Sequence, residues 1–258
     1  MSNIKREFDR RKFIKGCLLG GVGLGILPTL SKMHEVLGST EKLAEYVPEI
    51  RSYGMGINVK ACIGCGKCVN ACEQENNVPK DPMYYRTWVE RYTLLLSGET
   101  IVESPFGGSR GFTDTHQESK ILKSFFVPKL CNHCKNAPCV QVCPVGATFT
   151  TSEGVVLVDK DYCIGCSYCL QACPYGARFM NPITHTADKC TFCYHRLSRG
   201  LLPACVEVCP TKARIFGDTK LRSSQLTRFF RQNEIQVLKG GLNTDPQVFY
   251  ARLDGEVR

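Results

Sequence analysis

The chain has 258 residues, of which 43% are hydrophobic and 22% are charged, and its formal net charge is +9. This composition supports a folded core and excludes wholesale disorder. No run of 18 or more uncharged apolar residues occurs, which excludes an ordinary membrane-spanning helix. The 17 cysteines are too many for an ordinary intracellular enzyme and too few for a small disulfide scaffold, so their spacing decides the interpretation.

The first 38 residues have the order of an export signal. Arg10 and Arg11 precede an uncharged stretch rich in Leu and Gly, from residue 16 to residue 31, and a polar region follows. The paired arginines resemble a twin-arginine signal, which implies a cargo that is exported already folded around its cofactor. We therefore expect a periplasmic protein. No Ala-x-Ala cleavage triplet follows, so residues 1–38 are either removed or retained as an anchor.

Apart from Cys17, the cysteines form four quartets of related spacing. The first and third read Cys-x2-Cys-x2-Cys-x3-Cys, the second Cys-x2-Cys-x4-Cys-x3-Cys, and the fourth Cys-x2-Cys-x11-Cys-x3-Cys. The third quartet, with the proline that follows it, is the run found in bacterial ferredoxins. In chain order the quartets are Cys62, Cys65, Cys68 and Cys72; Cys131, Cys134, Cys139 and Cys143; Cys163, Cys166, Cys169 and Cys173; and Cys190, Cys193, Cys205 and Cys209.

This spacing suits four 4Fe-4S clusters. A Cys-x2-Cys-x2-Cys loop can wrap three thiolates around one cluster, and Gly64, Gly66 and Gly165 allow backbone N–H groups to point at it. The third and fourth cysteines stand four residues apart, so a one-turn helix places them on one face, about 6 Å apart along its axis. Proline follows the fourth cysteine in three quartets and ends the turn, whereas Glu73 follows the first quartet and the helix can continue.

Other uses of the cysteines fit the pattern less well. Structural zinc sites join paired Cys-x2-Cys elements across a long gap, which only the fourth quartet approaches. Disulfides are opposed by the helical spacing that recurs in every quartet. A c-type haem needs Cys-x-x-Cys-His, which never occurs, and a Rieske centre needs two histidine ligands. His133 and His195 are expected to be hydrogen-bond donors or exposed side chains rather than ligands.

The sequence predicts an α+β fold of two ferredoxin-like units, that is, tandem bacterial-type 4Fe-4S ferredoxin folds with a long insertion and much irregular chain. Three quartets end in the repeat Cys-Pro-x-Gly/Lys-Ala, and short apolar runs at 55–59 and 154–159 predict strands beneath the cluster loops. The expected organisation is an outer lobe from 50–125 and 184–240, an inner lobe from 126–183, and a C-terminal tail at 241–258.

A long insertion lies between residues 73 and 130. It contains Trp88, the sole tryptophan, several tyrosines, and a tract rich in Gly, Ser and Thr from residue 104 to residue 119. The segment is too long for an inert loop in a compact domain. Two interpretations stay open: a hairpin with a solvated tip, or a docking surface for a larger subunit with Trp88 as an anchor.

From about Tyr53 to Leu253 the chain resembles the four-cluster electron-transfer subunits of the polysulfide, tetrathionate and dimethyl sulfoxide reductase type. It resembles in particular the exported iron-sulfur subunit of the formate-dependent nitrite reductase pathway. The shared stretches are Cys-Ile-Gly-Cys, which occurs twice, Cys-Asn-His-Cys with Ala-Pro-Cys at 131–139, Thr-Ala-Asp-Lys-Cys-Thr-Phe-Cys at 186–193, and Leu-Pro-Ala-Cys-Val-Glu at 202–207.

The resemblance implies that paired quartets exchange their fourth cysteine, the first with the fourth and the second with the third. The implied ligand sets are Cys62, Cys65, Cys68 and Cys209; Cys190, Cys193, Cys205 and Cys72; Cys131, Cys134, Cys139 and Cys173; and Cys163, Cys166, Cys169 and Cys143. No ligand is missing from these sets.

The resemblance also implies one-electron transfer along four clusters, without catalysis by this chain itself. The implied partners are a polytopic quinol-binding membrane subunit and an exported catalytic subunit, either a molybdopterin enzyme or a multihaem cytochrome. The protein would then be periplasmic and membrane-associated through these partners. The sequence has no P-loop and no Rossmann glycine motif after a strand, so substrate chemistry has no evident site.

Two alternative functions stay open. One is a free-standing periplasmic polyferredoxin, and the other is a subunit whose cluster reduces a substrate directly, although sixteen ligands leave no open iron. Nucleic acid is not expected as a partner, because the negative charge of thiolate-bound clusters offsets the basic excess of the chain.

Overall fold

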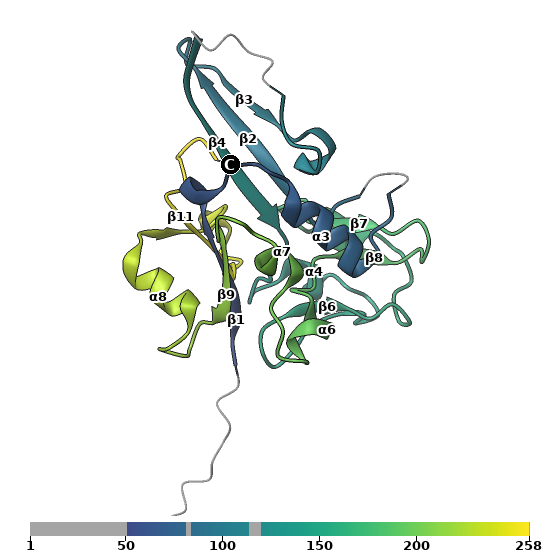
Figure 1. Ribbon diagram of the computed structural model, residues 1–258. Coiled ribbons are helices and arrows are strands. Elements are labelled where there is room, and N and C mark those ends of the chain that lie inside the picture. Colours follow the sequence, from purple (N-terminus) through teal and green to yellow (C-terminus); the bar gives the residue numbers. More distant parts are fainter. Residues whose placement is uncertain (1–50, 81–83, 114–119, 258) are drawn as a thin grey trace, which may run out of the picture. The chain divides into compact units, whose positions relative to one another are not determined.

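Short strands and one-turn helices dominate the computed structural model, which describes residues 51–80, 84–113 and 120–257 (Figure 1). The strands are β1 (Tyr53–Asn58), β2 (Thr87–Leu95), β3 (Thr100–Glu103), β4 (Ile121–Leu130), β5 (Thr148–Thr150), β6 (Val156–Val158), β7 (Arg178–Met180), β8 (Ala187–Lys189), β9 (Arg214–Asp218), β10 (Ile235–Gln236) and β11 (Val248–Ala251). The helices are α3 (Lys67–Asn76), α4 (Pro138–Gln141), α5 (Tyr168–Gln171), α6 (Tyr194–Leu197), α7 (Ala204–Glu207) and α8 (Gln225–Gln232), with 3-10 turns η1 (Val59–Ala61), η2 (Pro105–Gly108) and η4 (Gly240–Leu242). This mixed content agrees with the expected α+β class. The expected export signal, Arg10 and Arg11 included, and Cys17 lie outside the described residues.

The largest sheet has the order β10-β11-β1-β9, in which β1 runs parallel to β11 and antiparallel to β9. Helix α8 covers one face of this sheet, and a Cβ atom added at Gly56 would lie 2.7 Å from the ring of Phe229. Glycine in β1 therefore lets the helix approach the strand closely. The apolar run expected at 55–59 is confirmed as strand β1 over most of its length.

The segment expected as a C-terminal tail contributes a strand to this sheet. Val248 and Tyr250 in β11 are fully buried, and the Tyr250 hydroxyl donates a hydrogen bond to the carbonyl of Pro128 at 3.1 Å. Residues 248–251 are therefore part of the core, because their apolar side chains pack beside β1.

The long insertion forms a three-stranded antiparallel sheet of order β3-β2-β4, which Figure 1 shows in teal. Strands β2 and β4 pair from Thr87 opposite Leu130 to Leu95 opposite Ile121. The consecutive strands β2 and β3 form a hairpin, as one of the two open interpretations has it, and β4 pairs with the other edge of β2. The carbonyl of Gly108 lies 2.1 Å from the place a Cβ atom on Gly66 would take, so the insertion packs directly on the first cysteine loop.

Two small hairpins, β5-β6 and β7-β8, support the second and third quartets. Strand β6 falls within the apolar run predicted at 154–159. Helix α4 packs against α5, and helix α3 packs against α7, so the four helices that carry the third cysteines occur in pairs. In the described part of the chain, no helix combines the length and apolarity needed to cross a bilayer.

Candidate iron-sulfur cluster sites

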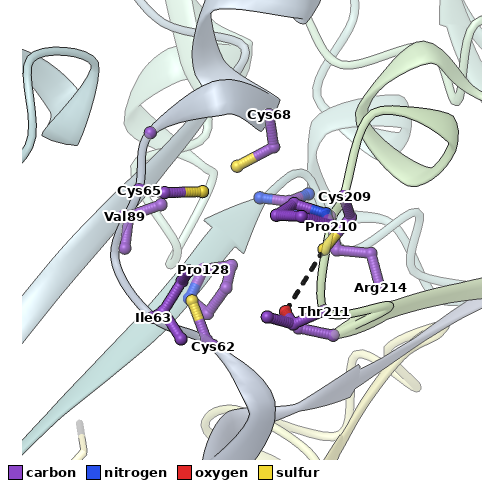
Figure 2. Close-up of a pocket in the computed structure, with 12 residues that line it drawn as sticks. Cys62, Ile63, Cys65, Cys68, Val89, Pro128, Cys209, Pro210, Thr211 and Arg214 are labelled. Carbon is purple, nitrogen blue, oxygen red and sulfur yellow. Dashed lines mark hydrogen bonds between the residues drawn. The ribbon is translucent and has the colours of Figure 1, made fainter.

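A pocket is lined by four cysteines that come from two distant segments. Figure 2 shows Cys62, Cys65 and Cys68 on one side, and Cys209 on the other. Burial raises the pKa of Cys62 to about 11, and the nearby thiols of Cys68 and Cys209 raise it as well. The first three cysteines of the first quartet and the last cysteine of the fourth quartet therefore share one cavity.

The backbone takes the same conformation in all four Cys-x-x-Cys loops. The residue before the second cysteine has a positive φ in each: 69° at Gly64, 42° at His133, 72° at Gly165 and 52° at Phe192. A left-handed residue turns neighbouring N–H groups to the inside of a loop, which creates a site for an anion. The sequence predicted this role for the glycines but not for the two residues with large rings.

Each third cysteine lies in the first turn of a short helix, as the spacing predicts. Helices α4, α5 and α7 have four residues each and end two residues before the fourth cysteine of their quartet. The helix was expected to run up to the proline, but it is shorter, and the fourth cysteine follows it. In the first quartet α3 continues through Cys72 to Asn76, as Glu73 allowed.

Cys72 lies beside the first three cysteines of the fourth quartet. Burial raises its pKa well above the ordinary value, and the thiols of Cys190, Cys205 and Cys193 raise it further. The Asn76 amide Nδ2 lies 3.6 Å from Cys72 Sγ and 3.7 Å from Cys193 Sγ, so one donor contacts both segments. The structure thus brings together a second group of four cysteines.

Three cysteines of the second quartet lie beside the last cysteine of the third quartet. Burial raises the pKa of Cys134 to about 12, a hydrogen bond with Thr244 lowers it, and the neighbouring thiols of Cys131, Cys139 and Cys173 raise it. These four cysteines therefore form a third group.

Burial raises the pKa of Cys169, and Arg178 lowers it. The thiols of Cys163 and Cys166 also raise it, so the first three cysteines of the third quartet lie together. Cys143 has a different environment. Burial raises its pKa, but N–H groups of Thr148, Val145 and Ala147 lower it below the ordinary value. The backbone at Cys143 therefore favours a thiolate.

Three buried cations face these thiols and were not foreseen from the sequence. Arg178, Lys189 and Arg214 are 8%, 1% and 2% exposed, and none forms an ion pair with a carboxylate in the described ranges. The ammonium group of Lys189 donates to the carbonyls of Val156 and Cys190. Buried charges without counter-charges are costly, so the site requires an anionic group. For two of these cations the sequence does contain a signal, because Arg178 and Arg214 each directly follow the alanine of a Cys-Pro-x-x-Ala repeat.

The residues present fit thiolate-bound clusters. Within the ranges that the structure describes, no three His, Cys, Asp or Glu side chains converge closely enough to share a single metal ion. Tetrahedral zinc requires four ligand atoms about 2.0 to 2.3 Å from one centre, whereas these thiols surround a cavity. A group with several irons, negative charge and four thiolates matches the spacing of the thiols, the inward N–H groups and the unpaired cations.

The two histidines differ from one another. His133 is fully buried, and its Nδ1 accepts a hydrogen bond from the N–H of Val156 at 3.1 Å. His133 is therefore not exposed. Burial lowers its pKa, as do Lys189 and Arg178, and a backbone hydrogen bond at Cys190 that raises its pKa agrees with the expected role as a donor. His195 is exposed, as expected, with Nε2 2.7 Å from a carboxylate oxygen of Glu75.

Trp88 is partly buried in β2, and its indole N–H donates to Glu90 Oε1 at 2.7 Å. Its polar atom is therefore satisfied within the chain. This contact does not test whether the insertion docks to a larger subunit.

Comparisons with known proteins agree with the cysteine geometry. A 4Fe-4S dicluster domain matches residues 61–147, and a second 4Fe-4S dicluster domain matches residues 122–219. A tetrathionate reductase subunit of Salmonella typhimurium is 46% identical over 204 residues, which cover 78% of this chain and 73% of the relative. Protein NrfC of Escherichia coli is 37% identical over 246 residues, or 94% of each chain.

A third relative is the Hdr-like menaquinol oxidoreductase iron-sulfur subunit 1 of Archaeoglobus fulgidus. It is 32% identical, with 96% of this chain and 99% of the relative covered. The chain belongs to the family of 4Fe-4S dicluster electron-transfer subunits of respiratory oxidoreductase complexes. Its cofactors are 4Fe-4S clusters, and two dicluster domains together with sixteen cysteines in ferredoxin-like spacing are consistent with four of them.

Proposed function

We propose that the chain holds four 4Fe-4S clusters in two ferredoxin-like lobes and relays single electrons along them. The proposed ligand sets are Cys62, Cys65, Cys68 and Cys209; Cys190, Cys193, Cys205 and Cys72; Cys131, Cys134, Cys139 and Cys173; and Cys163, Cys166, Cys169 and Cys143. The observation that carries the proposal is the cavity that Cys209 shares with three cysteines of the first quartet. The pKa effects support the sets completed by Cys72 and Cys173 and the grouping of Cys163, Cys166 and Cys169, and the family resemblance assigns Cys143 to that last group.

The burial of the cysteines supports a linear order for the relay. Cys65 and Cys166 are exposed, whereas both cysteines of the Cys-x-x-Cys loops at 131–134 and 190–193 are buried. Cys190 lies close enough to Cys131 for that thiol to raise its pKa, beyond the larger effect of burial. The sets that contain Cys65 and Cys166 are therefore the two ends, and the other two sets lie between them.

The protein supplies an insulated path for the electrons. When bound, a 4Fe-4S cluster accepts and releases one electron, at a potential that its surroundings set. The buried loops exclude water from the middle of the path, and backbone N–H groups stabilise the negative charge of the thiolates. The exposed loops give partner proteins access at either end.

We also propose the partners and the location. One end exchanges electrons with a polytopic quinol-binding membrane subunit, and the other exchanges them with an exported catalytic subunit that has molybdopterin or multihaem cofactors. The names of the relatives, a menaquinol oxidoreductase and a tetrathionate reductase subunit among them, support this assignment. The paired Arg10 and Arg11 support export to the periplasm. In this proposal catalysis belongs to the partner subunit, and no residue of this chain is assigned a catalytic role.

Anaerobic purification from the native membrane tests the proposal. We expect about four irons for each set of four cysteines, with nearly equal sulfide, an S = 1/2 EPR signal on reduction, and co-migration with larger subunits. Half of that iron or less, or one zinc per quartet, contradicts the cluster assignment. Migration of the holoprotein alone supports a free-standing polyferredoxin instead.

A further inference from the structure

Two buried arginines occupy equivalent positions in the two proposed lobes. Arg178 and Arg214 each follow the alanine that ends a Cys-Pro-x-x-Ala repeat, and each begins a strand, β7 or β9. Both are almost fully buried. The repeat therefore places the same type of side chain at the same structural position twice.

The two arginines make the same kinds of contact, each with a threonine hydroxyl and with the third cysteine of one quartet in its lobe. Nη2 of Arg178 donates to Cys139 Sγ at 2.9 Å, and its Nη1 donates to Thr148 Oγ1 at 3.4 Å. Nη1 of Arg214 lies 3.7 Å from Cys205 Sγ, and its Nη2 donates to the hydroxyl of Thr87 at 2.7 Å. Thr148 is the first residue of β5, which comes after the second quartet, and Thr87 is the first residue of β2, which comes after the first quartet. A threonine thus orients a guanidinium toward a thiol in both lobes.

Each guanidinium faces thiols from both cluster sets of its lobe. Burial lowers the pKa of Arg214, but the thiols of Cys68 and Cys205 outweigh this effect and raise it. For Arg178 burial acts in the same way, and Cys139 and Cys169 are among the thiols that raise the pKa. In both lobes these are the third cysteines of the two quartets.

The two side chains carry fixed positive charge. Neither has a carboxylate partner in the part of the chain that the structure describes, and a guanidinium keeps its proton at any physiological pH. This contrasts with buried Arg86, whose Nη2 lies 2.8 Å from Asp188 Oδ1. The charges of Arg178 and Arg214 therefore face the cluster sites without a neutralising carboxylate.

We propose that Arg178 and Arg214 raise the reduction potentials of both clusters in their own lobes, a role that rests on the proposed ligand sets. Reduction adds negative charge to a cluster, and a nearby buried cation stabilises that charge strongly because little solvent screens it. Arg178 acts on the clusters bound through Cys139 and Cys169, and Arg214 acts on those bound through Cys68 and Cys205. Thr148 and Thr87 are the residues that position them.

Potentiometric titration of the purified holoprotein, followed by EPR, tests this role. Signals are assigned to each lobe from Cys169→Ser and Cys209→Ser proteins. We expect Arg178→Gln to shift the reduction equilibrium of inner-lobe clusters about tenfold toward the oxidised form, which is about 59 mV for a one-electron couple. Arg214→Gln does the same in the outer lobe only.

Two further variants separate charge from structure. Arg178→Lys and Arg214→Lys keep the charge and should keep the potentials close to those of the wild type. Arg91→Gln is the matched control, because Arg91 is also a buried arginine but pairs with Glu103 on a neighbouring strand. Its removal should leave all four potentials unchanged.

The outcomes decide the inference. Unchanged potentials in Gln variants with wild-type iron content overturn it, and so does an equal shift of all clusters. If a Gln variant loses iron, the inference requires that the loss is confined to its own lobe and that the corresponding Lys variant keeps its iron. A Lys variant that loses the same iron also overturns the inference. Wild-type protein with fewer than four clusters contradicts the proposed function instead.

Discussion

The imidazole ring of His133 stacks on the phenyl ring of Phe192, with centroids 3.7 Å apart and planes inclined by 23°. Each residue holds the left-handed position of its Cys-x-x-Cys loop, where the two exposed loops have glycine. Both rings are buried. The stack therefore joins the two buried loops, and with them the two middle sites of the proposed relay.

Removal of one ring should weaken this junction. Phe192→Ala leaves a cavity beneath His133, and truncation of a buried Phe typically costs about 3–5 kcal/mol. We expect the visible absorbance of the clusters to be lost at a clearly lower temperature. Phe149→Ala is the control, because Phe149 is 40% exposed and its truncation should change little. Equal effects of the two substitutions would show that the stack does not hold the loops together.

The pairing of cysteines across quartets makes a spectroscopic prediction. If Cys72 completes the set of Cys190, Cys193 and Cys205, then Cys72→Ser and Cys190→Ser should alter the same EPR component. Cys62→Ser should instead match Cys209→Ser, because these thiols share one cavity. If Cys72→Ser and Cys62→Ser change one common signal, and the Cys190 signal is intact, each quartet closes on itself.

Removal of iron should destabilise the whole fold rather than leave empty pockets. Without clusters, the charges of Arg178, Lys189 and Arg214 are buried with no compensating anion, and such groups cost several kcal/mol each. Anaerobic chelation should therefore abolish near-UV circular dichroism and speed hydrogen exchange in β7 and β9. An apoprotein with native dichroism and slow exchange would show that the cations do not depend on the clusters.

The ion pair of Arg86 with Asp188 should contribute strongly to stability. Nη2 of Arg86 lies 2.8 Å from Asp188 Oδ1, and both side chains are less than 10% exposed. Asp188→Asn leaves a buried cation unpaired and should cost about 3–5 kcal/mol in thermal or denaturant unfolding. The exposed pair of Lys135 with Asp245 is the control, since Asp245→Asn should cost no more than about 1 kcal/mol. Similar losses in both variants would refute this assignment.

The export signal makes a prediction that is independent of the fold. Replacement of Arg10 and Arg11 by Lys should leave holoprotein in the cytoplasm, because a receptor reads the paired arginines. Cell fractionation with iron analysis measures this, and Arg6→Lys is the matched control. Normal export of the Lys-Lys protein would contradict twin-arginine transport.

Much of the site could be predicted because ligand spacing is a local property of the sequence. Cysteine spacing alone predicted the short helices at Cys68, Cys139, Cys169 and Cys205, and Glu73 predicted the longer helix α3. Pro138 is the first residue of α4, a position that suits proline because its fixed φ matches the start of a helix.

The remaining features depend on contacts between distant segments. A buried arginine such as Arg214 looks like a surface residue in the sequence, because only the folded chain brings the thiols of Cys68 and Cys205 around it. The large rings of His133 and Phe192 stand where a turn would favour glycine, and each makes sense only against the other. The pairing of β11 with β1 likewise depends on a contact between segments that are far apart in the sequence.

Strand β11 also determines when the protein can mature. Because β1 lies between β9 and β11, the sheet beside the first cysteine loop is complete only after residues 248–251 have left the ribosome. Residues that support the inner-lobe cysteines are synthesised earlier and pair with near neighbours in the chain. A nascent chain therefore reaches its final packing around the first quartet last, so stable packing around that site depends on the C-terminal strand.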